Sequence, residues 1–242
     1  MMAPVVSCVI PVLNGERYLG AALESVLGQT SGAVEVIVAD DGSTDGTRDV
    51  AAAFGARVRY LHQANAGHAA ARNLGLAAAA GAFVAFLDAD DLWHEDKLAR
   101  QLARFERRPE LGISVTHVRN FWSADAPPPD GGIDPRVMEA VPGYRSVTLL
   151  ARRRVFELVG PFDPALRHGN DTAWFLRAAE HGVAMELLPD VLVYRRLHAG
   201  NRSRRLAESS RREYLRILKA SLDRRRRDPA TPPRPYAFPS GA

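Results

Sequence analysis

The sequence predicts an α/β protein with a Rossmann-like, mostly parallel central sheet and helices on both faces. Short apolar runs, as buried strands would give, alternate with segments of helical periodicity over residues 5–107. Two of these runs, residues 34–39 and 82–87, end in clusters of aspartates. Open α/β sheets bind ligands at the carboxyl ends of their strands. A chain of 242 residues is long enough for one such domain.

The first half of the chain gives the regular part of this pattern. Its predicted strands are residues 5–13, 34–39, 57–61 and 82–87. Its predicted helices are residues 16–27, 43–54, 68–79 and 95–107, and Ser43 or Thr44 would cap the second of them.

After residue 107 the pattern becomes less regular. We expect, in order, a strand at 113–119, a loop rich in proline and glycine at 123–134 that is mobile, mixed strand and helix at 147–159, a helix at 171–180, a strand at 191–197 and an amphipathic helix beginning at residue 206. The proline-rich residues 229–242 are expected to be disordered.

The charge of the chain is concentrated near its end. The net charge is +4, but residues 202–227 hold eleven basic and three acidic residues, so this segment carries +8 and the rest −4. A nucleic-acid partner is therefore not expected, because the body is not basic. The N-terminus has no signal-peptide pattern and the longest apolar run is 14 residues, short of a membrane span, so we expect a cytoplasmic protein.

Several common nucleotide and metal motifs are missing from the sequence. No G-x-G-x-x-G follows the first strand, neither of the two lysines follows a glycine as in a P-loop, and there is no H-E-x-x-H. The aspartate clusters therefore need another explanation. Each alone is typical of a turn or helix start, but two of them at one sheet edge would repel unless a cation joined them.

Six segments together resemble the family 2 glycosyltransferases, which are nucleotide-sugar-dependent enzymes with a GT-A fold. They are VIPVLN (9–14), SVLGQT (25–30), VADDGSTD (38–45), NAGHAAARN (65–73), FLDADD (86–91) and NDTAWFLR (170–177). The resemblance implies a GT-A domain over residues 1–205. Residues 1–119 would be its donor half and residues 120–205 its acceptor half, followed by a basic amphipathic helix at 206–228.

The resemblance also implies roles for residues that would bind the nucleotide sugar. Pro11, Asn14 and Glu16 would line the nucleotide pocket. Asp41 would accept a hydrogen bond from the uracil N–H of a UDP-type donor. Arg72 would approach the nucleotide or its diphosphate, because a guanidinium suits phosphate, although it could instead lie on a helix surface.

The second cluster would serve the metal and the diphosphate. Asp90, with Asp88 or Asp91, would hold Mn²⁺ or Mg²⁺, which favour oxygen ligands shared with substrate phosphates. His198 would approach the metal or diphosphate, or be an ordinary surface or core histidine; both interpretations stay open.

Asp171 matches the catalytic base of the family, which implies direct displacement with inversion. It could also cap the helix that follows. The chain departs from the family pattern next to this residue, since Asn170 replaces the usual Glu and Ala173 stands where many members carry a second acid.

Two other functions stay open on the sequence. One is a sugar-phosphate nucleotidyltransferase, which uses a similar architecture, and the other is a sugar-nucleotide-binding protein with a decayed base site. The acceptor is not identified and could be a glycan, a lipid-linked molecule, a peptide or a small molecule. The basic helix could be solvated, bind a partner protein or lie on an anionic membrane as a peripheral contact.

Overall fold

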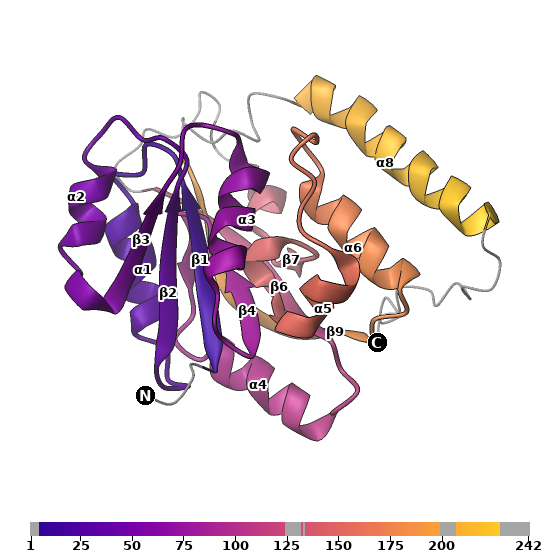
Figure 1. The fold of residues 1–242 in the computed structure, drawn as a ribbon, viewed down its shortest axis with the longest axis horizontal. Coiled ribbons are helices and arrows are strands. Elements are labelled where there is room, and N and C mark those ends of the chain that lie inside the picture. The colour runs from indigo at the N-terminus through magenta and orange to yellow at the C-terminus, as the bar shows by residue number, and fades with distance from the viewer. Residues whose placement is uncertain (1–4, 124–131, 133, 199–206, 228–242) are drawn as a thin grey trace.

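A mixed sheet of nine strands runs through the part of the chain that the computed structural model describes, namely residues 5–123, 132, 134–198 and 207–227 (Figure 1). The strand order is β3-β2-β1-β4-β8-β6-β9-β5, and β7 pairs with β6 beside this path. The strands β3, β2, β1 and β4 are parallel, as the sequence predicts, and β8 is antiparallel to both of its neighbours.

The elements follow the predicted alternation through the first half. The strands are β1 (Val6–Val12), β2 (Val34–Asp40), β3 (Val58–His62), β4 (Phe83–Phe86), β5 (Leu92–Trp93), β6 (Ile113–Trp122), β7 (Val141–Pro142), β8 (Leu150–Arg152) and β9 (Met185–Leu197). The helices are α1 (Leu19–Leu27), α2 (Thr47–Ala52), α3 (His68–Ala78), α4 (Lys97–Arg107), α5 (Arg153–Val159), α6 (Asn170–Glu180) and α8 (Ala207–Arg227), with short 3₁₀ turns η1 (Gly55–Arg57), η2 (Pro135–Met138) and η3 (Ser146–Thr148).

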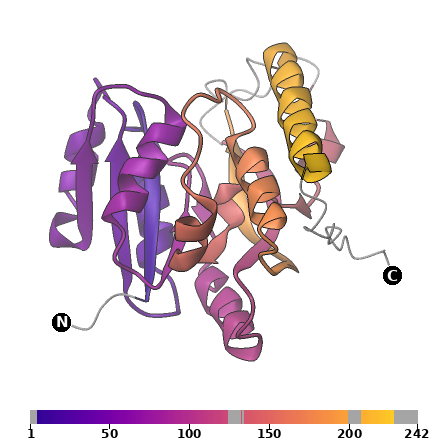
Figure 2. The same ribbon diagram turned by 45° about the vertical axis from the view of Figure 1, so that its right-hand side comes forward.

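Each face of the sheet is covered by its own layer of helices (Figures 1 and 2). Side chains alternate along a strand, so Cys8 and Ile10 of β1 pack with α1, α2 and α4, whereas Val9 packs with α3, α5 and α6. Helix α8 lies outside this arrangement and packs on α6 through Ile217. The expected α/β architecture with helices on both faces is confirmed.

The expected cap of the second helix is wrong. Helix α2 begins only at Thr47, after Gly46, and no side chain caps it. Ser43 and Thr44 instead bind Asn14 in the loop after β1: Ser43 Oγ accepts from Asn14 N at 2.8 Å, and Thr44 N donates to Asn14 Oδ1 at 2.8 Å. These residues fix two strand-end loops to each other.

The last strand is longer than its sequence pattern indicates. Strand β9 begins at Met185 rather than residue 191 and runs parallel to β6. The register shifts between Thr116 and His117, where Pro189 and Asp190 have no opposite residue on β6. Proline is tolerated in a strand at such an irregularity. Because the proline and the register shift interrupt the alternating pattern, the continuous strand cannot be recognised from the sequence periodicity.

Two expectations lie largely or wholly outside the described residues: the mobile loop at 123–134 and the disordered tail at 229–242. The expected mixture of strand and helix at 147–159 corresponds to η3, β8 and α5. Trp174 and Phe175 are buried in the helix layer. No helix among the described residues is long and apolar enough to cross a membrane.

Candidate active site

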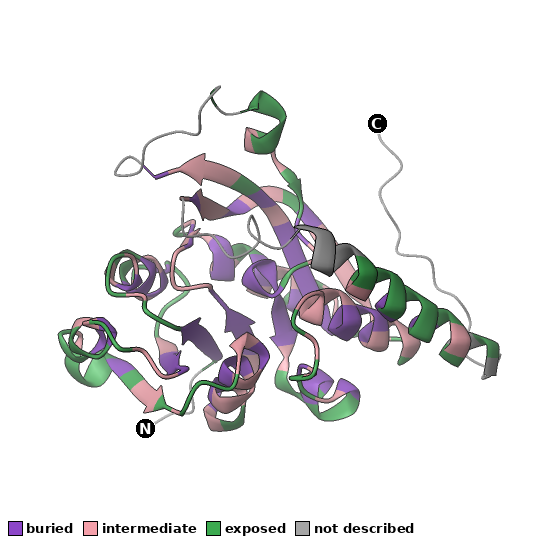
Figure 3. Ribbon diagram, turned by 90° about the horizontal axis from the view of Figure 1, so that it is seen from above, coloured by how far each residue is buried: buried purple, intermediate pink, exposed green. Residues whose placement is uncertain are grey.

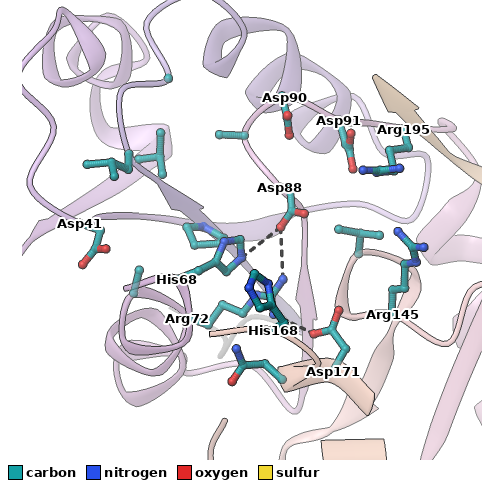
Figure 4. Close-up of a pocket in the computed structure, with 18 of the residues that line it drawn as sticks. Asp41, His68, Arg72, Asp88, Asp90, Asp91, Arg145, His168, Asp171 and Arg195 are labelled. Atoms are coloured by element: carbon teal, nitrogen blue, oxygen red, sulfur yellow. Dashed lines mark hydrogen bonds and ion pairs between the residues drawn. The ribbon is translucent and has the colours of Figure 1, made fainter. Parts of the chain in front are cut away.

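A pocket of about 610 Å³ lies at the carboxyl ends of β1, β2 and β4. The first half of the chain contributes the end of β1, Asp41, one face of α3 and the loop after β4. The second half contributes the loop before η3, the start of α6, the end of β9 and one residue of α8. The two halves therefore face each other across one cavity (Figure 4).

Nearly all of the residues with expected site roles line this pocket. They are Pro11, Asn14, Asp41, Arg72, Asp88, Asp90, Asp91, Asp171 and His198. Glu16 does not line it. Its Oε2 accepts from Gly46 N at 3.1 Å, and its own N–H donates to Asp45 Oδ2 at 3.1 Å. A Cβ at position 46 would come within 2.7 Å of Glu16 Oε1, so glycine allows this contact.

The first aspartate cluster is a rigid part of the wall. Asp41 is buried and its oxygens accept from Gln63 Nε2 at 2.7 Å, Ala66 N at 2.9 Å and Gly67 N at 2.9 Å. Its neighbour Asp40 accepts from Ser43 N and from the Tyr60 hydroxyl. Asp41 therefore holds the loop that leads into α3 and also borders the cavity.

Arg72 connects the two sides of the pocket. Its Nη1 lies 2.7 Å from Asp171 Oδ1, and its Nη2 lies 3.4 Å from Asp88 Oδ1. His68 Nε2 lies 3.3 Å from the same Asp88 oxygen (Figure 4). Arg72 is only 5% exposed, so it is not the surface arginine that the sequence leaves open. Burial by itself raises the pKa of Asp88, but His68 and Arg72 outweigh burial and hold this pKa well below its usual value.

Asp90 and Asp91 have different surroundings. Asp91 is buried, and its Oδ1 accepts from Arg196 N at 2.9 Å. Burial and the charges of Asp90 and Asp88 raise the pKa of Asp91 well above its usual value. Asp90 Oδ2 lies 3.0 Å from His198 Nε2. His198 therefore adjoins the second aspartate cluster, as one of its two interpretations requires.

The second cluster has ligand types that suit a hard divalent cation. Carboxylate and imidazole ligands are compatible with Mn²⁺, and carboxylate oxygens with Mg²⁺. Within the described residues, however, no three His, Cys, Asp or Glu side chains are placed to hold a metal by themselves. The cluster fits an ion that takes part of its coordination from a phosphorylated ligand, which is how Mg²⁺ is commonly bound.

Asp171 lies in the first turn of α6 and does not cap it. The helix begins at Asn170, and the preceding Gly169 has a φ of 67°. A Cβ at position 169 would come within 2.6 Å of Ile217 on α8, so glycine suits both the backbone and this contact. The second Asp171 oxygen is 3.4 Å from Ser146 Oγ. The carboxylate is thereby held over the pocket.

The two departures from the family pattern have structural explanations. Asn170 Nδ2 donates to Leu166 O at 2.8 Å, a bond that a glutamate carboxylate could not make. Its buried Oδ1 has no hydrogen-bond partner among the described residues. Ala173 is buried against Ile217 of α8, where a carboxylate would be desolvated.

Sequence reasoning missed several residues of the pocket, namely His68, Arg145, Arg167, His168, Arg195 and Tyr214. His68 lies inside one of the family-like segments, so its position could have been noticed. Arg145, Arg167 and Tyr214 stand outside all six segments. The fold alone brings them to the cavity.

Comparison with known proteins places these features in a family. Residues 7–157 match Glycosyl transferase family 2. An uncharacterized glycosyltransferase of Nostoc sp. is 34% identical over 216 residues, covering 81% of this chain and 66% of the relative.

Solved structures show the same GT-A fold. S. aureus TarS 1–349, solved with UDP, has a TM-score of 0.66 at 20% identity and covers 79% of this chain and 60% of that one. The mannosyltransferase PcManGT of Pyrobaculum calidifontis, solved with GDP-Man and Mn²⁺, has a TM-score of 0.67 at 21% identity, covering 93% and 65%. The chain spans about two thirds or less of the length of the curated relatives that it matches. On the family match and the identity to its relatives, this chain belongs to glycosyl transferase family 2.

Proposed function

We propose that this chain transfers a sugar from a nucleotide diphosphate sugar to an acceptor hydroxyl by direct displacement, with inversion at the anomeric carbon. The contact of Arg72 with both Asp171 and Asp88 is the observation that carries the proposal. It joins the candidate base of the acceptor half to a carboxylate of the donor half, within one pocket of about 610 Å³. A cavity of that size is typical of small-molecule sites.

The donor would bind at the ends of β1 and β2, with Pro11, Asn14 and Asp41 around its base. Asp41 accepts three hydrogen bonds, and a carboxylate has about four acceptor positions, so capacity for a uracil N–H remains. UDP is the donor nucleotide that this role of Asp41 favours. Because PcManGT was solved with GDP-Man, guanine is the alternative to test.

The diphosphate would lie beside the second aspartate cluster. Asp90, with Asp88 or Asp91 and His198, would hold Mn²⁺ or Mg²⁺ there, and PcManGT supports this because it was solved with Mn²⁺. Such an ion neutralises the charge that develops on the leaving diphosphate. Arg72 would add positive charge on the α3 side of the same group, and His68 lies beside it there.

Asp171 would remove the proton of the acceptor hydroxyl as that hydroxyl attacks. Arg72 pairs with one oxygen of Asp171, and Ser146 helps to fix the other. Asn170 and Ala173 each have a packing role in the structure.

The first experiment is isothermal titration of the protein with UDP, GDP and dTDP, each with and without Mn²⁺. We expect tightest binding of UDP, strengthened by Mn²⁺. An Asp90→Asn variant should lose most of the increase in UDP affinity that Mn²⁺ causes. Asp96→Asn on the surface is its control. Binding of none of the three nucleotides under either condition would contradict the proposal.

The second experiment is a screen of donors against acceptors with mass spectrometry of the products. A product heavier than the acceptor by one sugar, with release of nucleoside diphosphate, is the expected result. Release of pyrophosphate from a nucleoside triphosphate would instead support a nucleotidyltransferase.

A further inference from the structure

Helix α8 packs on α6 through a narrow face. Ile217 is buried against Ala173 and Leu176 of α6. Ser221 Oγ donates to Glu180 Oε1 at 2.5 Å, and Arg224 binds both oxygens of the same glutamate. Among the side chains of α8 that the structure describes, one buried aliphatic residue, Ile217, and polar contacts therefore attach the helix.

The larger apolar residues of α8 remain exposed: Tyr214 lies at the edge of this contact, beside Gly169, and three leucines follow it along the helix. Tyr214, Leu215, Leu218 and Leu222 are 41%, 62%, 45% and 54% exposed. Tyr214, Leu218 and Leu222 follow one another at intervals of four residues, and Leu215 lies beside them, so the four form one stripe along the helix. Figure 3 shows α8 exposed over most of its described length. A soluble helix normally turns such a stripe toward the core.

Basic side chains flank this stripe. Arg212, Arg216, Lys219 and Arg226 are exposed on the same helix, and the acidic residues between them are Glu213 and Asp223. The segment 202–227 carries +8 against −4 for the rest of the chain. An exposed apolar stripe bordered by arginine and lysine is the pattern of a helix that lies in a membrane interface.

We propose that α8 docks lengthwise on an anionic lipid bilayer through its stripe and the flanking basic residues. The leucines would enter the boundary between headgroups and acyl chains, and the basic side chains would contact acidic headgroups. Packing the stripes of two copies against each other would bring two basic helices together, so self-association is disfavoured by charge. A helix that lies along the interface in this way makes a peripheral contact.

Docking through α8 would bring the pocket close to the membrane. Tyr214 begins the stripe and also lines the candidate active site. An acceptor carried by the membrane could then reach Asp171 without leaving the interface. This consequence for the acceptor rests on the proposed function, whereas membrane docking itself does not.

Vesicle flotation of the full chain tests the docking. The probes are vesicles of phosphatidylcholine alone and vesicles that also contain phosphatidylglycerol. We expect binding to the second kind only, weakened by salt. The variant Leu215→Ser/Leu218→Ser/Leu222→Ser should bind at least about tenfold more weakly. The control is Leu158→Ser, an equally exposed leucine (56%) on α5, which should bind like wild type.

Three results would overturn the inference: no vesicle binding by wild type, equal binding to both kinds of vesicle, or an oligomer that the triple variant dissociates. Light scattering after size exclusion checks the last of these. UDP titration of the triple variant separates the two proposals. If the triple variant binds UDP normally but no longer floats with the vesicles, the result supports docking. If wild type floats with the vesicles but does not bind UDP, the result contradicts only the proposed transferase function.

Discussion

Arg72 on α3 and Asp171 on α6 form an ion pair of 2.7 Å between residues 99 positions apart in the chain. The pair joins the strand–helix units of the first half to the helix that carries the candidate base. Arg72 is 5% exposed, so this contact is made in a partly dry environment, where a charge is costly without a partner. Its two partners, Asp171 and Asp88, make the arginine a common support for both sides of the pocket.

Asp171→Asn should stop sugar transfer without stopping nucleotide binding. An amide keeps the size of the side chain but cannot take a proton, so we expect transfer to fall by about 10²–10⁴-fold. UDP affinity should stay near wild type, because the donor contacts lie elsewhere. Asp163→Asn is the matched control, since that aspartate accepts from Ala165 N in a nearby loop. Transfer near the wild-type rate in Asp171→Asn would rule out this residue as the base.

Arg72→Lys should lose function although the charge is kept. A lysine ammonium lacks the planar fork of an arginine, so it cannot meet Asp171 and Asp88 in the same geometry. We expect transfer to fall by more than about tenfold. The melting temperatures of wild type and variant are measured first, so that activity is compared at a temperature at which both proteins are folded. The control is Arg59→Lys. Arg59 is exposed and donates to Ala78 O at the end of α3, the helix that carries Arg72, and this variant should behave like wild type.

The side of the pocket that the first half of the chain forms could be predicted from the sequence because its residues lie in local patterns. A parallel strand is followed at once by its own functional loop, so strand periodicity alone is enough to place the clusters at Asp41 and Asp88 at one sheet edge. Glu16 shows the limit of this reasoning. It lies in the loop that follows β1, yet its carboxylate turns to Gly46.

The side of the pocket that the second half of the chain forms could not be predicted in the same way. Arg145, Arg167 and Tyr214 come from three separate segments and meet only through long-range packing. The meaning of Ala173 depends on Ile217, which lies 44 positions later on another helix. The sequence pattern also predicts an amphipathic helix from residue 206, but it could not tell that Tyr214, Leu218 and Leu222 of α8 are exposed.

Glu213 should act as a positioning residue for the loop before α6. Its two carboxylate oxygens accept from Arg167 N at 3.1 Å and His168 N at 2.7 Å. Glu213→Ala should lower the free energy of unfolding by about 1–3 kcal/mol, because two donors lose a charged acceptor. Transfer should fall more than UDP affinity, since the loop leads to Asp171.

Two variants make the Glu213 result specific. Glu213→Gln keeps one acceptor oxygen and should restore part of the transfer activity. Asp223→Ala removes an acid from the same helix without touching the loop and should leave transfer unchanged. Equal losses of UDP affinity and transfer in Glu213→Ala would show a general loss of structure instead of a positioning effect.

The amine of Lys97, at the start of α4, is buried inside the protein. It is fully buried, donates to Gln101 Oε1 at 2.8 Å, and lies 4.2 Å from the centre of the Trp93 ring. Burial lowers the pKa of Lys97 from 10.5 to about 7, although the nearby Cys8 partly opposes this. In the unfolded chain the same lysine holds its proton to about pH 10.

Stability should therefore rise with pH through this lysine. Between about pH 7 and pH 10 the unfolded state binds more protons than the folded state, so the free energy of unfolding gains up to about 1.4 kcal/mol per pH unit. Lys97→Met removes the titrating group. Urea unfolding at a series of pH values should therefore give the variant a higher free energy of unfolding than wild type at low pH, and this difference should shrink as the pH rises. Lys219→Met on α8, where the lysine is exposed, is the control and should run parallel to wild type. A gap between Lys97→Met and wild type that stays constant over this range would show that Lys97 is not held with a lowered pKa.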